Sequence, residues 1–86
     1  MKIRFVYSGR NYDAVASLPP EMELPEGSNV DDLLAHVNRL LPQDRPLPAS
    51  AMLAASGQHL GPIGQHSPRV LGEGDEVMIV APVAGG

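Results

Sequence analysis

The feature that most limits how this chain can fold is one well-marked amphipathic helix, predicted over residues 30–41. Asn29 is a good N-cap for it, and Pro42 stops it. Asp31 and Asp32 fall in the first turn, where the helix dipole favours acidic side chains. The apolar residues recur at helical spacing on one face: Val30, Leu33, Leu34, Val37, Leu40 and Leu41. A single helix cannot bury its own apolar face, so we expect it to pack across a sheet.

The rest of the chain supplies candidate strands for that sheet. Residues 2–8 alternate, with Ile3, Phe5 and Tyr7 on one side, which is typical of a half-buried strand. Further strands are predicted at residues 21–24, 49–55 and 77–81, with a weak one among the turns of residues 56–67. The resulting order is strand, strand, helix, strand, weak strand, strand. We therefore predict the α+β class and the β-grasp (ubiquitin-like) fold, a mixed sheet with one main helix packed across it.

Composition excludes several kinds of protein. The chain has 86 residues, enough for one domain, and no cysteine, which excludes disulfides, thiolate metal sites and a cysteine nucleophile. The net charge is −4 and the basic residues are scattered, which argues against nucleic-acid binding. No apolar run approaches the ~20 residues of a membrane span, and the N-terminal residues do not read as a signal peptide. We expect a cytoplasmic protein with no membrane partner.

No side-chain active site is visible in the sequence. The three histidines have no metal-ligand spacing, and the serines have no hydrolase context. The acidic residues Glu73, Asp75 and Glu76 flank a glycine-rich turn, and we interpret them as a solvated turn, with contact to a basic partner as the alternative. What remains as a reactive group is the backbone carboxylate of Gly86.

The last sixteen residues read LGEGDEVMIVAPVAGG and divide the chain into a domain, residues 1–81, and a flexible diglycine tail, residues 82–86. Five residues extend about 16 Å at ~3.3 Å per residue. Glycines lack a Cβ, so the end of the tail could thread a narrow channel. A carboxylate presented in this way can be activated by another enzyme. The alternative is a frayed terminus.

The strand before the tail is apolar on both faces. Val77, Ile79 and Ala81 form one face, and Met78 and Val80 lie on the other. Such a pattern indicates a central strand. With one helix to cover the sheet, we expect part of the second face to be exposed as a partner site. Alternatively, residues 43–48 or 56–67 fold over it.

Several segments together resemble the sulfur-carrier proteins of the MoaD/ThiS type. These are the first strand, the capped helix with its DDLL segment, the LGEGDEV turn and strand, and the terminal PVAGG. The resemblance covers the whole chain and is most specific in residues 74–77 and 82–86. Within the family, a hydrophobic strand leading into proline, valine, a small residue and diglycine is most similar to the small subunits of molybdopterin synthase.

The resemblance implies a sulfur-transfer cycle centred on Gly86. An adenylating enzyme of the ubiquitin-activating type would use ATP to activate its carboxylate, and a sulfurtransferase or desulfurase would supply sulfur for a thiocarboxylate. The large subunit of molybdopterin synthase would then accept the tail, and sulfur would pass to the pterin precursor. The chain itself would bind no cofactor and no metal. The resemblance implies these partner contacts: Met78, Val80, Pro82, Val83, Ala84 and Gly85.

Three alternatives stay open at this point. The sulfur could serve thiamine, cysteine or tRNA thiolation instead. The chain could be a ubiquitin-like protein modifier, although Lys2 is its single lysine and leaves little scope for chains. It could also be a β-grasp interaction module whose tail is inert.

Overall fold

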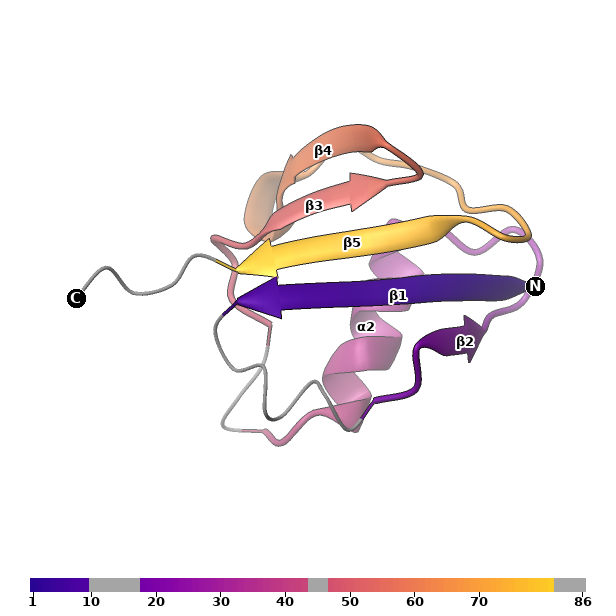
Figure 1. Cartoon of the computed structure of the whole chain (residues 1–86), viewed down its shortest axis with the longest axis horizontal. Coiled ribbons are helices and arrows are strands. Elements are labelled where there is room, and N and C mark those ends of the chain that lie inside the picture. Colours follow the sequence, from indigo (N-terminus) through magenta and orange to yellow (C-terminus); the bar gives the residue numbers. More distant parts are fainter. Residues whose placement is uncertain (10–17, 44–46, 82–86) are drawn as a thin grey trace.

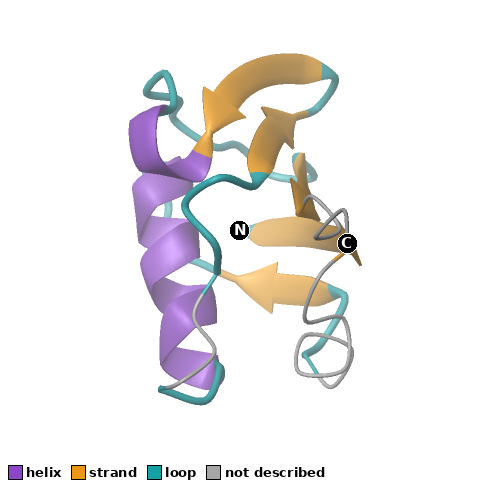
Figure 2. Cartoon of the chain, turned by 90° about the vertical axis from the view of Figure 1, so that its left-hand side faces the viewer, coloured by secondary structure: helices purple, strands orange, loops and turns teal. Residues whose placement is uncertain are grey.

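The computed structural model describes residues 1–9, 18–43 and 47–81, and within them a helix packs on one face of a five-stranded sheet (Figures 1 and 2). The elements, in chain order, are β1 (Lys2–Gly9), β2 (Glu21–Glu23), α2 (Val30–Leu40), β3 (Met52–Ala55), β4 (Gln58–Pro62), the 3₁₀ turn η1 (Ile63–Gln65) and β5 (Glu76–Ala81).

The sheet is mixed, with strand order β2-β1-β5-β3-β4. Strands β1 and β5 pair in parallel, whereas the other three pairings are antiparallel. The last strand therefore lies in the middle of the sheet, as its apolar pattern predicted. The predicted β-grasp arrangement of one helix across a mixed sheet is confirmed.

Helix α2 begins with a capping box. The Asn29 side chain accepts from the Asp32 N–H at 2.9 Å, and the Asp32 carboxylate accepts from the Asn29 N–H at 2.9 Å. These bonds satisfy backbone donors that have no partner inside the helix. The predicted start is confirmed, and the helix ends one residue earlier than predicted, at Leu40.

One residue predicted for the buried face of the helix, Leu40, is exposed. Leu40 is 48% exposed, whereas Leu41 is 6% exposed and lies in the core. At about 3.6 residues per turn, Leu40 falls at the edge of the apolar stripe that is centred on Val30 and Val37, so it faces solvent although it is helical. Leu41 is the C-cap and is extended, and its side chain is still buried.

The core lies between α2 and the inner face of the sheet. Its largest fully buried side chains come from the helix and from β1, β3 and β5: Val30, Leu33, Val37, Ile3, Leu53, Val77 and Ile79. Two strand predictions were too long, because Leu24 follows the end of β2 and residues 49–51 precede β3 as a turn. The weak strand of residues 56–67 is confirmed as β4. Among the described residues, no helix is long and apolar enough to cross a bilayer.

Candidate functional site

The diglycine tail continues from a strand that is held on both sides. The last residue of β5, Ala81, is opposite Gly9 of β1, and the residue before it, Val80, is opposite Met52 of β3. Ala81 is buried. The sheet thus fixes the point from which the chain continues toward Gly86.

The predicted tail residues themselves lie outside the described residues. They are Pro82, Val83, Ala84, Gly85 and Gly86. The division at residue 81, the partner contacts of residues 82–85 and the reactive role of Gly86 therefore stay predictions.

Gly9 packs closely against Ala81 because of its backbone conformation and its lack of a side chain. It has a φ of +112°, a conformation that L residues with side chains rarely adopt. A Cβ at this position would collide with the carbonyl oxygen of Ala81. Glycine at position 9 thereby lets the two strand ends lie close together. The sequence analysis did not single out Gly9, because its contact with Ala81 depends on the pairing of β1 with β5.

An outer apolar patch lies on the face of the sheet that α2 does not cover. We define it as Met52, Met78 and Val80, which are 38%, 39% and 44% exposed. Met52 lies opposite Val80 in the register of β3 and β5, so the two side chains are cross-strand neighbours. The predicted exposure of Met78 and Val80 is confirmed, and the described residues of the two segments proposed as a cover do not bury them.

Met52 is a member of this patch that the sequence analysis missed. Its alternation with the buried Leu53 was a signal that it faces the other side of the sheet. Its neighbourhood with Val80, however, depends on a strand pairing that the sequence does not specify. Two exposed methionines beside a valine form an adaptable contact surface, because unbranched thioether side chains can adjust to different partner shapes.

A polar border lies on the same face, toward the start of β5. Arg4 and Glu76 are opposite each other in the pairing of β1 with β5, and Nε of Arg4 is 3.8 Å from a Glu76 oxygen. Both side chains are well exposed, so this ion pair contributes little to stability. Charged side chains at the edge of an apolar patch suit a role in orienting a partner.

The acidic turn before β5 is more structured than the sequence analysis expected. The Asp75 carboxylate accepts from the Gly72 N–H at 2.7 Å and from the Ser56 hydroxyl at 2.8 Å, and it lies 3.5 Å from the Arg69 guanidinium. The Gly72 bond first, and then the Ser56 bond, hold the pKa of Asp75 below its ordinary value. The turn is solvated as predicted, since residues 72–74 are exposed, but Asp75 is held in it by hydrogen bonds that the sequence analysis did not foresee.

Arg69 extends this network to the β3–β4 turn. Its guanidinium donates to the Ala55 carbonyl at 3.2 Å and to the Gln58 side-chain oxygen. Residues from three separate segments thereby hold the start of β5 in place. No sequence signal pointed to this network, since its bonds to Ser56, Ala55 and Gln58 join residues that are 11 to 19 positions apart.

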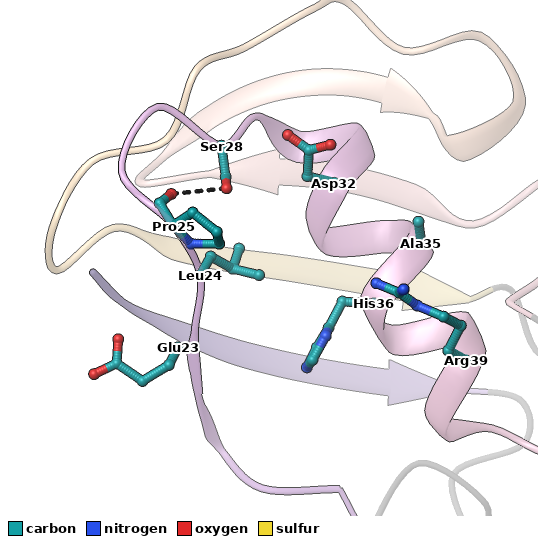
Figure 3. Close-up of a pocket in the computed structure, with 8 residues that line it drawn as sticks. All are labelled: Glu23, Leu24, Pro25, Ser28, Asp32, Ala35, His36 and Arg39. Carbon is teal, nitrogen blue, oxygen red and sulfur yellow. Dashed lines mark hydrogen bonds between the residues drawn. The ribbon is translucent and has the colours of Figure 1, made fainter.

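A pocket of about 370 Å³ lies on the helix side of the molecule (Figure 3). Its lining residues are Glu23, Leu24, Pro25, Ser28, Asp32, Ala35, His36 and Arg39. The Ser28 hydroxyl donates to the Pro25 carbonyl at 2.7 Å, and Asp32 belongs to the capping box. These two polar groups serve the local fold, and the pocket does not include β5, from which the tail continues.

Comparisons with known proteins agree with this fold. The model of the ThiS family matches residues 6–86. A solved structure from Pyrococcus furiosus, described as a molybdopterin converting factor, subunit 1, has a TM-score of 0.69 and 22% identity, and the match covers 96% of this chain and 99% of that one. SAMP1 from Haloferax volcanii has a TM-score of 0.68 and 16% identity over the whole of both chains. A comparison with curated protein sequences finds no match.

At these identities the two structures establish the shared β-grasp fold, while the family model spans nearly the whole chain, from β1 through the diglycine. The chain belongs to the ThiS family and has the architecture of the MoaD/ThiS-type ubiquitin-like sulfur carriers.

Proposed function

We propose that this chain is a sulfur carrier of molybdopterin biosynthesis and acts as the small subunit of molybdopterin synthase. One observation carries the proposal: a central strand of a ThiS-family fold leads directly into a diglycine end and carries an exposed apolar patch beside that exit. The strand that carries the proposed docking surface is thus the same one that leads into the tail with the proposed reactive terminus.

The chemistry proposed for this chain takes place on the backbone of Gly86. A partner enzyme transfers AMP from ATP to the carboxylate, which turns a poor acyl donor into a good one. Sulfide-level sulfur (HS⁻) from the sulfur donor then attacks the acyl carbon, AMP leaves with the electron pair of the broken C–O bond, and the terminus becomes a thiocarboxylate. Gly85 provides clearance, because residues without a Cβ fit where side chains would collide with the walls of a channel.

The outer apolar patch is proposed to dock the partners that work on the tail. Met78 and Val80 of β5 lie next to the point where residue 82 follows Ala81, and Met52 of the neighbouring strand β3 is opposite Val80. A partner that covers the patch would therefore receive the tail at a defined place. Pro82, Val83, Ala84 and Gly85 would complete the contact, and Pro82 would limit the entropy lost on ordering, because its φ is already restricted.

The partners follow from the steps. They are an adenylating enzyme of the ubiquitin-activating type, a sulfurtransferase or desulfurase, and the large subunit of molybdopterin synthase. The chain itself binds no cofactor in this proposal, and ATP is consumed by the activating enzyme.

The choice of pathway is supported by the PVAGG ending and by the name of the Pyrococcus furiosus protein with a similar fold. The family match is equally compatible with a carrier that serves thiamine, cysteine or tRNA thiolation, and the fold with a protein modifier. These alternatives differ in the acceptor, so an experiment on the acceptor separates them.

Intact mass tests the carrier step. The chain is incubated with the cognate activating enzyme, ATP and a sulfur donor, and an increase of about 16 Da is expected because one oxygen is exchanged for sulfur. A chain without residues 85–86 is the control and should keep its mass. A full-length chain that never gains this mass, although the enzyme is active on another carrier, would contradict the proposal.

The acceptor is tested with the purified thiocarboxylate form. Mixed with the large synthase subunit and the pterin precursor, it should return to its original mass while a dithiolene product forms. Loss of sulfur to a thiazole, cysteine or tRNA acceptor, with none to the pterin, would replace the molybdopterin pathway by that alternative. Transfer of the intact chain to another protein would instead identify a modifier.

A further inference from the structure

Lys2, at the start of β1, is an exposed amine with a fixed backbone. It is the single lysine of the sequence, and its side chain lies on the outer face of the sheet. Its N–H donates to the Glu73 carboxylate at 3.1 Å, and its carbonyl accepts from the Gly74 N–H at 2.9 Å. Across the described ranges, no ion pair or hydrogen bond engages its ammonium group. The amine is therefore accessible to an electrophile.

The α-amino group of Met1 is unavailable for such a reaction. It donates to the Leu24 carbonyl at 2.8 Å and lies 3.3 Å from a Glu23 carboxylate oxygen. The hydrogen bond to Leu24 is partly buried. This amine could attack an acyl group only after both contacts were broken, so Lys2 is the accessible primary amine.

Lys2 and the end of β5 lie at opposite ends of two parallel strands (Figure 1). Because Gly9 is opposite Ala81, the separation is close to the length of β1 from Lys2 to Gly9, about 23 Å at ~3.3 Å per residue. Residues 82–86 span about 16 Å when extended at ~3.3 Å per residue.

The tail would also have to reverse its direction, and the central residues of a turn add little reach. Even with the four-carbon stem of the lysine, about 6 Å, the chain cannot join its own Gly86 to its own Lys2. The acyl donor for Lys2 therefore has to be another molecule, and a second copy of this chain carries the same diglycine end.

We propose that Lys2 is acylated by the activated Gly86 of a second copy of this chain, so that the copies are joined head to tail. The proposal rests on the activation of Gly86 proposed above. The unprotonated ε-amine attacks the acyl carbon of the adenylate and forms a C–N bond. The bond from that carbon to the phosphate oxygen breaks, AMP leaves with the electron pair, and the nitrogen loses a proton to water. The product is a Gly86–Lys2 isopeptide, and ATP supplies the activation.

This reaction is compatible with docking on the outer apolar patch. Both sites lie on the outer face, but the patch is next to the ends of β1 and β5: Val6 is opposite Met78, and Ser8 is opposite Val80. Lys2 is four residues before Val6, about 13 Å away along the strand. An activating enzyme seated on the patch of one copy would therefore leave the lysine of that copy open.

The test uses the full chain, the cognate activating enzyme and ATP, with the sulfur donor left out so that the adenylate persists. Pyrophosphate release measures activation, and denaturing electrophoresis with intact mass detects a covalent dimer of twice the chain mass less one water. Trypsin should then yield residues 1–4, uncut at Lys2, joined to residues 70–86. The matched variant is Lys2→Arg, which keeps the positive charge but cannot form the isopeptide.

We expect the dimer to be lost in Lys2→Arg while pyrophosphate release is unchanged. Three results would overturn the proposal: dimers that persist in Lys2→Arg, a junction at the amine of Met1, or activation at the normal rate with no dimer. If pyrophosphate release is absent from the wild-type chain as well, it is the activation of Gly86 that has failed, and Lys2 loses its acyl donor with it.

Discussion

Gly9 lies opposite Ala81 so closely that a side chain on the glycine would occupy the space of the alanine carbonyl oxygen. This contact sits at the end of β5, one residue before the tail. It ties the end of the first strand to the point from which the reactive terminus continues, and it leads to the first prediction.

Gly9→Ala should destabilise the chain by more than a positive φ alone would. A comparable glycine supplies the control: Gly27 has a φ of +85°, but a Cβ there would meet nothing within 4 Å. We expect Gly27→Ala to cost about 1 kcal/mol from backbone strain, and Gly9→Ala to cost clearly more because β1 and β5 must separate. Urea unfolding of both variants measures the difference, and equal costs would show that the close approach to Ala81 does not matter.

The two leucines of α2 that differ in burial should respond differently to truncation. Leu34 is 6% exposed and Leu40 is 48% exposed. We expect Leu34→Ala to lower the free energy of unfolding by about 2–5 kcal/mol, because it opens a cavity in the core. Leu40→Ala should cost less than about 1 kcal/mol, since surface changes to a good helix former are usually tolerated. Denaturant midpoints of the pair decide the matter, and similar losses would mean that Leu40 is buried in solution.

Val80→Asp should weaken partner binding while the fold survives. The substitution puts a charge into the outer apolar patch, with a loss of stability of up to about 1 kcal/mol from its poorer strand propensity. Val70→Asp is the control, because Val70 is 68% exposed and belongs to none of the strands that form the patch. Titration calorimetry with the activating enzyme or the large subunit should show a loss for Val80→Asp alone. Equal affinities of the two variants would remove the patch from the binding surface.

The length of the tail should decide whether Gly86 can be activated. One added residue moves the carboxylate about 3.5 Å, and Gly86→Ala places a Cβ beside the reacting carbonyl. Both changes should leave the unfolding transition unchanged and slow adenylation strongly, as measured by pyrophosphate release. Normal thiocarboxylate formation by the extended chain would mean that the reaction does not depend on the position of Gly86.

His66 should make stability depend on pH near neutrality. Its Nδ1 lies 2.8 Å from the Ser67 carbonyl oxygen and its Nε2 lies 2.7 Å from the Asp31 carboxylate, so both ring nitrogens face acceptors and the imidazolium can donate to both. The Ser67 bond first, and then Asp31, raise the pKa of His66 above 6.5, although burial opposes the shift. This interaction connects the segment after η1 to the first turn of α2.

Because the folded pKa is the higher one, the stabilisation is complete below about pH 6.5 and is lost as the pH rises through the folded pKa. His66→Asn should remove this part of the pH dependence of the unfolding free energy, whereas His59→Gln, at an exposed position of β4, should retain it. The unfolding free energy is measured from about pH 6 to about pH 8, because the ordinary pKa of histidine is about 6.5. If it changes with pH equally in the wild type and in His66→Asn, this role of His66 is contradicted.

Local patterns in the sequence determined the elements of this fold. The capping residues and spacing of α2 are properties of a dozen consecutive residues, and the alternation in β1 and β5 assigned each side chain to a face of the sheet. The excess of apolar residues on β5 over what one helix can cover predicted the exposure of Met78 and Val80. The PVAGG ending belongs to the sequence as well, and it is the basis of the proposed chemistry.

Tertiary structure alone decided which distant residues meet. The register of β3 and β5 brings Met52 beside Val80, and the parallel pairing of β1 and β5 presses Gly9 against Ala81. The hydrogen bond of Ser56 to Asp75 and the contact of His66 with Asp31 depend on the same long-range packing. Periodicity reports which face a residue occupies, but register is set by the whole sheet and core. Leu40 shows the limit of periodicity itself, since its spacing is helical but it lies at the edge of the apolar stripe and is exposed.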